Sequence, residues 1–147
     1  PSFGTFLMYG SLCRLMFVFF LFFFFNDTAT TEIYTADVAF RDPVHTLQGL
    51  PALRDYYRRL YDGVVSCRFE FDDEILQQDR GALVWRMRFQ HARFRRGETL
   101  ELRGVSHLKF RDDGKVFQHH DYFDMGEFIY ERVAVLGGVI RAIKSRL

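Results

Sequence analysis

Two runs of alternating polar and apolar residues, joined by the turn Asp112-Asp113-Gly114, constrain the fold of this chain most. Glu98–Arg111 and Lys115–Asp124 both alternate with the two-residue period of a β-strand. A turn of this composition closes a β-hairpin, so the two strands are expected to pair with one face of each toward the core. On that inward face the pattern places three polar residues, which are Ser106, His119 and Asp121.

The segments before this hairpin add further strands and one helix. Leu50–Val64 has the periodicity of an amphipathic helix. Strands are expected over Asp37–Asp42, Val65–Asp72 and Ala82–Gln90. A helix followed by sequential strands on short connections predicts the α+β class, with antiparallel neighbours. We therefore expect a curved antiparallel sheet wrapped on helices over residues 36–124, and a C-terminal helical extension over residues 125–147.

Residues 1–35 differ sharply from the rest of the chain. They hold nine of the 18 phenylalanines and only three charged residues. Read literally, residues 3–25 have the length of a membrane anchor. The run FFFFNDTATTEIYT at residues 22–35, however, resembles translated sequencing-adapter read-through, which recurs ahead of unrelated proteins in assembled environmental (metagenomic) sequence. We favour this second interpretation, and predict that residues 1–35 are non-native and replace the first helix of the domain.

Composition narrows the partners and the compartment. The formal net charge is +1 and the isoelectric point is about 8.3, so nothing points to nucleic acid or an anionic membrane as a partner. The two cysteines, Cys13 and Cys67, show no metal or redox spacing. A reducing, cytoplasmic location is predicted, with no cofactor and no metal.

Polar residues on apolar faces are the candidate site. Asp42 shares a face with Val38 and Phe40, where burial would raise the pKa of its carboxyl and suit it as a base. The alternative is an Asp-Pro turn, in which the carboxylate caps backbone N–H groups. His119 and Asp121 are two apart on one strand, so they point the same way and suit either proton transfer or a satisfied core pair.

Two longer motifs resemble a known group. DVAFRDPVHTLQGLPALRDYYRRLY and GVSHLKFRDDGKVFQHHDYFD, within Ala36–Asp124, resemble the nuclear transport factor 2-like superfamily, which includes ketosteroid isomerases and SnoaL-like polyketide cyclases. The resemblance implies a cone-shaped, cystatin-like α+β roll around a cavity, and a homodimer. It sets Asp42 at the isomerases' general base and Tyr57 at a tyrosine that supports their oxyanion site. Ser106 stands where those enzymes have a protonated aspartate, a role that serine cannot reproduce.

The sequence thus predicts a pocket for a small apolar or carbonyl-bearing ligand. Cofactor-independent proton transfer next to a carbonyl, of the isomerase or cyclase type, is the favoured function. A non-catalytic ligand-binding or dimerisation module is the alternative, and a membrane-tethered form a third if residues 3–25 are genuine. The predicted catalytic residues are Asp42, His119 and Asp121. The predicted substrate-binding residues are Tyr57, Trp85, Met87, Phe89, Ser106, Phe117 and Phe123.

Overall fold

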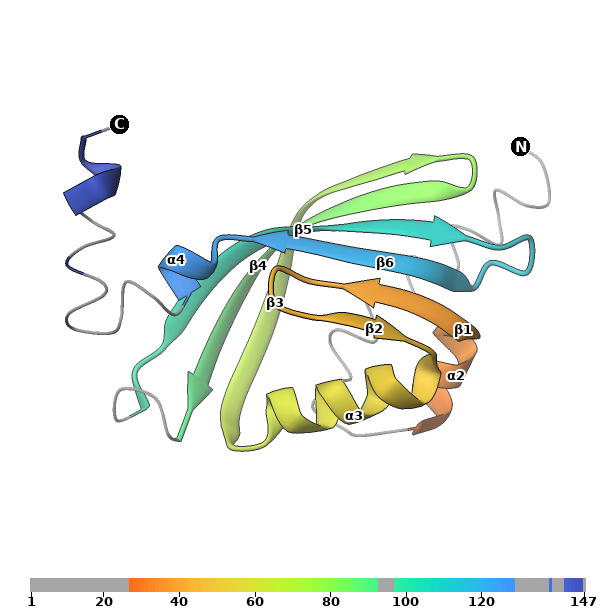
Figure 1. The fold of residues 1–147 in the computed structure, drawn as a ribbon, viewed down its shortest axis with the longest axis horizontal. Coiled ribbons are helices and arrows are strands. Elements are labelled where there is room, and N and C mark those ends of the chain that lie inside the picture. The colour runs from red at the N-terminus through yellow and green to blue at the C-terminus, as the bar shows by residue number, and fades with distance from the viewer. Residues whose placement is uncertain (1–26, 93–96, 129–137, 139–141, 147) are drawn as a thin grey trace.

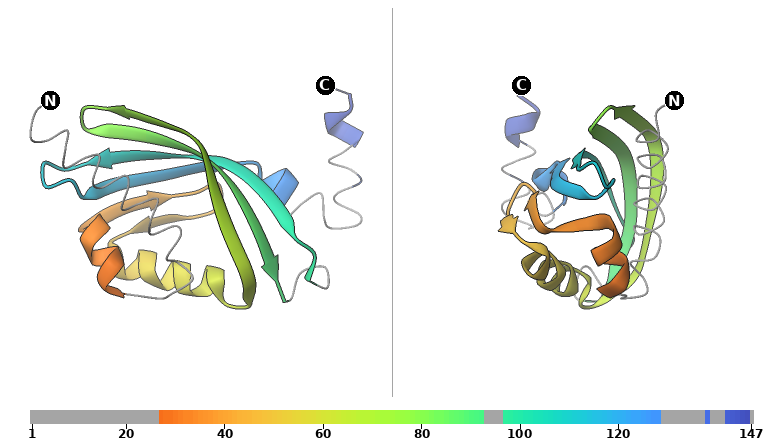
Figure 2. Two further views of the ribbon diagram at one scale, coloured as in Figure 1. Left: turned by 180° about the vertical axis from the view of Figure 1, so that it is seen from behind. Right: turned by 90° about the vertical axis from the view of Figure 1, so that its right-hand side faces the viewer.

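One six-stranded sheet, in the order β2-β1-β6-β5-β4-β3, makes up most of the fold. The computed structural model describes residues 27–92, 97–128, 138 and 142–146. Its strands are β1 (Tyr34–Arg41), β2 (Thr46–Gln48), β3 (Val64–Gln77), β4 (Arg80–His91), β5 (Leu100–Phe110) and β6 (Val116–Phe123). Its helices are α2 (Asp27–Ile33), α3 (Leu50–Tyr61) and α4 (Met125–Phe128). The sheet bends strongly, and α3 lies against its concave face (Figures 1 and 2). This confirms the predicted α+β class with a curved sheet.

Helix α3 forms where the periodicity predicts it. Leu50, Leu53, Tyr56 and Tyr57 bury its apolar side. Pro51 lies in the first turn, where its missing N–H costs nothing. The helix ends at Tyr61 and β3 begins at Val64, slightly earlier than predicted, because Gly63 adopts a left-handed φ of 87° between them.

The strand pairing differs from the prediction at one place. β3, β4, β5 and β6 pair consecutively and antiparallel, but β1 pairs with β6 in parallel. The chain leaves β1 through β2 and α3 and comes back through four strands, so β6 returns beside β1 in the same direction. The short strand β2 pairs antiparallel with β1 and was not predicted, because three residues are too few for an alternating pattern.

Phe117 lies on the opposite face of the sheet from the one predicted, because β6 has a bulge at its start. Lys109 pairs with Gln118, whereas Phe110 pairs with Val116, so one residue of β6 is extra. Val116 is fully buried and takes the inward place. The Phe117 ring instead lies under the Arg111 guanidinium, 5.4 Å from it. From Gln118 onward the predicted alternation holds.

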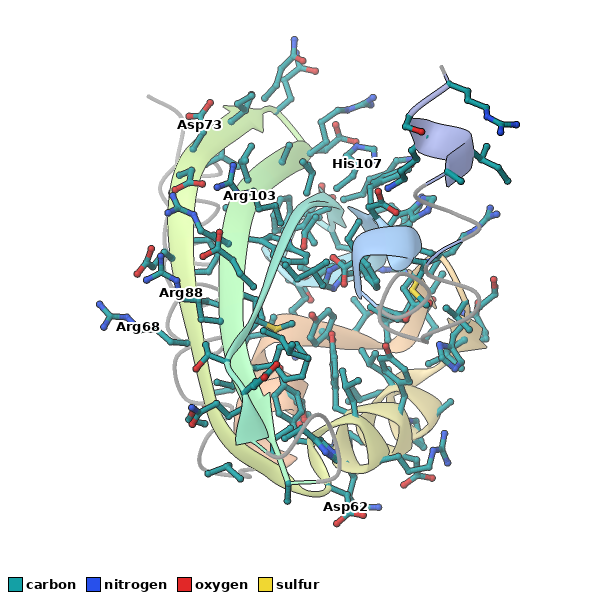
Figure 3. All side chains as sticks on the ribbon, turned by 90° about the vertical axis from the view of Figure 1, so that its left-hand side faces the viewer. Asp62, Arg68, Asp73, Arg88, Arg103 and His107 are labelled. Atoms are coloured by element: carbon teal, nitrogen blue, oxygen red, sulfur yellow. The ribbon has the colours of Figure 1, made fainter. Side chains whose placement is uncertain are left out.

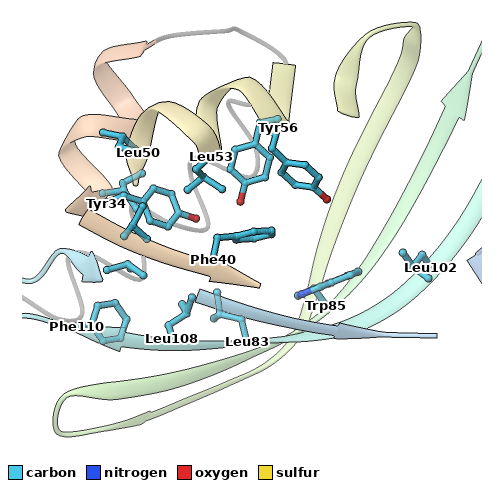
Figure 4. Close-up of a cluster of buried hydrophobic side chains, with 14 residues drawn as sticks. Tyr34, Phe40, Leu50, Leu53, Tyr56, Leu83, Trp85, Leu102, Leu108 and Phe110 are labelled. Atoms are coloured by element: carbon cyan, nitrogen blue, oxygen red, sulfur yellow. The ribbon is translucent and has the colours of Figure 1, made fainter. Parts of the chain in front are cut away.

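The core lies between α3 and the concave face of the sheet (Figure 4). Phe40 of β1 meets Tyr56 of α3 with ring centroids 5.3 Å apart, and Leu83 and Leu108 are fully buried beneath them. Ile33 and Tyr34 also belong to this core. The predicted boundary at residue 36 therefore falls inside β1. The non-native origin of residues 1–35 stays a prediction.

The convex face of the sheet carries paired charges (Figure 3). Arg86 contacts Asp72 at 2.6 Å, and Arg88 contacts Glu101 at 2.9 Å. Residues 3–25 lie outside the described residues, as does most of the predicted extension beyond α4. Within the described ranges, none of the helices has the length and hydropathy that crossing a membrane would require.

Gly104 makes room for the Trp85 indole between β4 and β5. A Cβ at position 104 would lie 2.3 and 2.4 Å from two indole carbons and 2.8 Å from the Tyr122 carbonyl oxygen. We predict that Gly104→Ala lowers the free energy of unfolding by about 1–3 kcal/mol, because the indole must shift in a packed core. Urea unfolding measures this. A variant as stable as the parent would show that the indole does not occupy this place.

Candidate functional site

A cavity of about 340 Å³ opens between α3 and the concave face of the sheet. Its walls come from β1, α3, β3, β4 and β6, and most of them are aromatic or aliphatic side chains. The described lining residues are Phe40, Asp42, Val44, His45, Tyr56, Tyr57, Leu60, Tyr61, Val64, Cys67, Phe69, Trp85, Met87, Phe89, Asp121, Phe123 and Met125.

Most of the predicted site residues meet at this cavity. Seven of them line it, namely Asp42, Tyr57, Trp85, Met87, Phe89, Asp121 and Phe123. Ser106 and His119 are fully buried and lie behind the wall rather than in it. Phe117 does not reach the cavity, because the bulge in β6 turns it to the other face.

The parallel pairing of β1 and β6 sets two carboxyl groups side by side. Phe40 pairs with His119, and their rings meet at 5.1 Å on the inward face. Arg41 pairs with His120, so Asp42 and Asp121 are the next residues along the two strands. Neighbouring strands lie about 4.8 Å apart. Both carboxyl groups therefore reach the same end of the cavity.

Asp42 is held by a turn and a tyrosine. Its Oδ1 accepts the Val44 and His45 N–H groups at 2.7 and 2.6 Å, and its Oδ2 accepts the Tyr56 hydroxyl at 2.5 Å. Burial, the largest single influence, opposes ionisation, but these hydrogen bonds together outweigh it and lower the pKa of Asp42. The raised pKa expected from the sequence is therefore wrong, and the Asp-Pro turn is present.

Two buried side chains hold Asp121 through one of its carboxylate oxygens. Its Oδ1 accepts the Ser106 hydroxyl, and the Nε2 atom of His119 lies 2.8 Å from the same oxygen. The side chain is 14% exposed, and Asp121 lines the cavity. Within the described part of the chain, both hydrogen bonds go to Oδ1. The other oxygen, Oδ2, takes part in neither of them and is left for a ligand in the cavity.

Proton counting fixes the direction of this network. The Trp85 indole Nε1–H can only donate, and it donates to Ser106 Oγ at 2.9 Å. Ser106 therefore gives its single proton to Asp121. An ionised Asp121 accepts only, so His119 carries its proton on Nε2, and its Nδ1 accepts the Tyr34 hydroxyl at 2.8 Å.

Tyrosines of α3 form part of the cavity wall, but the Tyr57 hydroxyl oxygen itself is fully buried. Burial raises the pKa of Tyr57 and of Tyr61 well above the ordinary value, so both stay protonated at neutral pH. Tyr56 and Tyr61 were not predicted as site residues, although both lie on the same apolar stripe of the helix as Tyr57. Burial also raises the pKa of the Cys67 thiol to about 11, so Cys67 stays a neutral thiol.

Among the described residues, no three His, Cys, Asp or Glu side chains come close enough together to hold a metal ion.

Comparison with known proteins identifies the group to which this fold is similar. The family model described as "SnoaL-like domain" matches residues 26–119, more than half of the chain. No curated protein sequence matches.

Solved structures agree with the family match in their fold. A protein from Jannaschia sp. CCS1, provisionally described as a SnoaL-like polyketide cyclase, has a TM-score of 0.78 and 13% identity, covering 91% of this chain and 96% of its own. An NTF2-like protein of unknown function from Burkholderia pseudomallei K96243 has a TM-score of 0.71 and 17% identity, and the match covers 84% of this chain and 98% of that protein. The epoxide hydrolase/cyclase-like enzyme SalBIII is reported to act in pyran ring formation in salinomycin. It has a TM-score of 0.67 and 15% identity, and the match covers 80% of this chain and 93% of that enzyme.

Asp42→Asn tests whether this carboxylate holds its turn. An amide has one acceptor oxygen and directs an NH₂ donor at groups that themselves donate, so we predict a loss of about 1–3 kcal/mol in the free energy of unfolding at pH 7. The folded-state pKa of Asp42 is lowered. Its contribution is therefore present above the unfolded pKa of about 3.9 and disappears as the pH falls through the lower folded value.

Urea unfolding across this acid range measures the effect. The difference between parent and variant should shrink as the pH falls. A difference that stays constant with pH would contradict the assignment of the carboxylate charge to the turn.

Proposed function

This chain belongs to the SnoaL-like domain family, and we propose that its cavity binds a small carbonyl-bearing molecule and transfers a proton next to the carbonyl without a cofactor. Asp121 is the base in this proposal. The single observation that carries it is the arrangement of this carboxyl group, which lines the cavity while Ser106 and His119 both hold its Oδ1 atom and so leave Oδ2 for a ligand. A base of this kind must reach the substrate proton at hydrogen-bond distance.

Asp42 has a different role in the proposal. Its carboxylate already accepts two backbone N–H groups and the Tyr56 hydroxyl, so no free oxygen is directed at a ligand. The lowered pKa of Asp42 also makes it a weak base at neutral pH. We therefore assign Asp42 to holding the turn and fixing Tyr56, in place of the base role that the resemblance implies.

The proposed step transfers one proton to Asp121 and shifts the electron pairs of the C–H bond and of the carbonyl π bond. Asp121 Oδ2 takes a proton from the carbon next to the substrate carbonyl. The C–H electrons form a C=C bond, and the carbonyl π electrons move to oxygen, which gives an enolate. The neutral hydroxyl group of Tyr61, a lining residue, is the candidate donor to that oxygen. Return of the proton to another atom completes an isomerisation. In a cyclisation, the enolate carbon attacks a second carbonyl, whose oxygen takes the proton back from Asp121.

His119 and Ser106 are positioning residues in this scheme. Both are fully buried, so neither touches the substrate, and both act on the reaction through Asp121 Oδ1. This replaces the sequence-based assignment of His119 as catalytic and of Ser106 as substrate-binding. Trp85, Met87, Phe89 and Phe123 form the apolar wall that holds the ligand.

A binding module without turnover is the second candidate. The observation that favours it is the wall itself, which is largely apolar and would hold a ligand without any chemistry.

We also propose that the chain is a homodimer, with Tyr122 at the contact. This side chain is 51% exposed and stacks on His120 outside the cavity.

Deuterium exchange on a model ketone tests the proposed base. We predict that the protein accelerates exchange of the α-hydrogens of 2-tetralone in D₂O, followed by NMR, and that Asp121→Asn lowers this rate about 10²-fold or more. Asp55→Asn is the matched control, because Asp55 is an exposed carboxylate on α3 that pairs only with Arg58 among the described residues. A folded Asp121→Asn variant that exchanges at the parent rate would contradict the assignment of Asp121 as the base.

Ser106→Ala tests the positioning role by separating rate from binding. Ser106 donates to Asp121 Oδ1, so its loss should lower the exchange rate about tenfold and leave the affinity for the ketone unchanged. Trp85→Phe keeps a ring in place but removes the N–H that orients the Ser106 hydroxyl, and should lower the rate by less. A Ser106→Ala variant that weakens ketone binding as much as it lowers the rate would indicate a packing role only.

A further inference from the structure

The cavity holds an aromatic corner beside Asp121. Phe69 of β3 and Trp85 of β4 meet edge to face, with centroids 5.7 Å apart and planes at 71°. Phe123 of β6 meets Trp85 at 6.3 Å and 55°. Since all three rings line the cavity, their differently inclined planes bound one part of it on several sides.

This corner is linked to Asp121 through Ser106. Phe123 follows Asp121 by two residues on the same face of β6, and the Trp85 indole reaches Asp121 through Ser106. Asp42 lies at the same end of the cavity through the β1–β6 register. Two backbone N–H groups and the Tyr56 hydroxyl stabilise the Asp42 carboxylate, and the His45 Nδ1 atom lies 3.3 Å from both of its oxygens.

We propose that the substrate of this site carries a positively charged, alkylated or protonated amine, which the ring faces of Phe69, Trp85 and Phe123 hold next to Asp42 and Asp121. Aromatic faces attract cations, and the attraction grows when water is excluded. Two carboxyl groups in the same low-dielectric cavity favour a cation and disfavour an anion. His45 is the titratable basic group among the described lining residues, and at 48% side-chain exposure it lies at the rim.

This inference deepens the proposed function, since it assumes that the cavity is the substrate site. It names the charge class of a carbonyl compound that would meet Asp121. It does not depend on turnover, because recognition of a cation needs only the rings and the carboxyl groups.

Three isosteric probes test the inference. Choline, 3,3-dimethylbutan-1-ol and 3,3-dimethylbutanoate present the same branched head, and the first is a cation, the second neutral and the third an anion. Trp85 is the only tryptophan of the chain and lines the cavity, so its fluorescence reports binding, with calorimetry as a second readout. We expect choline to bind at least about tenfold tighter than the neutral alcohol, and the anion to bind more weakly than either.

Matched variants locate the preference. Asp121→Asn and Phe69→Leu should each reduce the ratio of choline to alcohol affinity severalfold, whereas Asp55→Asn should leave it unchanged. If Asp121→Asn fails to fold, as judged by circular dichroism, Phe69→Leu alone decides. Equal affinity for choline and the alcohol, tighter binding of the anion, or no choline binding at millimolar concentration would each overturn the inference.

The outcome is separable from the exchange test. A cation preference without ketone exchange would leave the inference standing and remove the base role. Ketone exchange without a cation preference would support the base role of Asp121 and overturn the inference of a cationic substrate.

Discussion

The structure depends on how it satisfies one carboxyl group on the inner face of its last strand. An unpaired charge in such a place is costly, and partners on three neighbouring strands remove that cost here. Ser106 of β5 and His119 of β6 hold Asp121 Oδ1, and Trp85 of β4 fixes the direction of the Ser106 proton. The Trp85 indole lies so close to position 104 that a Cβ there would stand 2.3 and 2.4 Å from two of its carbons, and glycine avoids this clash.

This arrangement separates two neighbouring carboxyl groups by role. Asp42 is saturated by its own turn and by Tyr56, so it acts as a fixed negative charge and a structural anchor. Asp121 is held on one side only, which leaves its other oxygen for a ligand in the cavity. The same geometry underlies both proposals. A base held in place, Asp121, next to the fixed charge of Asp42 suits proton transfer. Two carboxyl groups beside inclined aromatic rings suit the binding of a cation.

Alternation predicted much of this fold from the sequence. It identified the inward faces of β4 and β5, and it set His119 and Asp121 on one face of β6 among apolar neighbours. It failed for Phe117 because a bulge adds a residue that no period shows. It could not find the parallel β1–β6 pair, which depends on the return path of the chain, nor the lowered pKa of Asp42, which depends on the Tyr56 contact. The family resemblance supplied the cone and its cavity, which local patterns do not contain.

The register of β6 is the claim on which the account rests, and nuclear Overhauser contacts test it most directly. In an isotope-labelled sample, the ring protons of Phe40 should show contacts to the His119 ring, and the Trp85 indole N–H to the β protons of Ser106. Contacts from Phe40 to His120 instead would mean that β6 is shifted by one residue. Asp121 would then face away from the cavity, which would contradict the account.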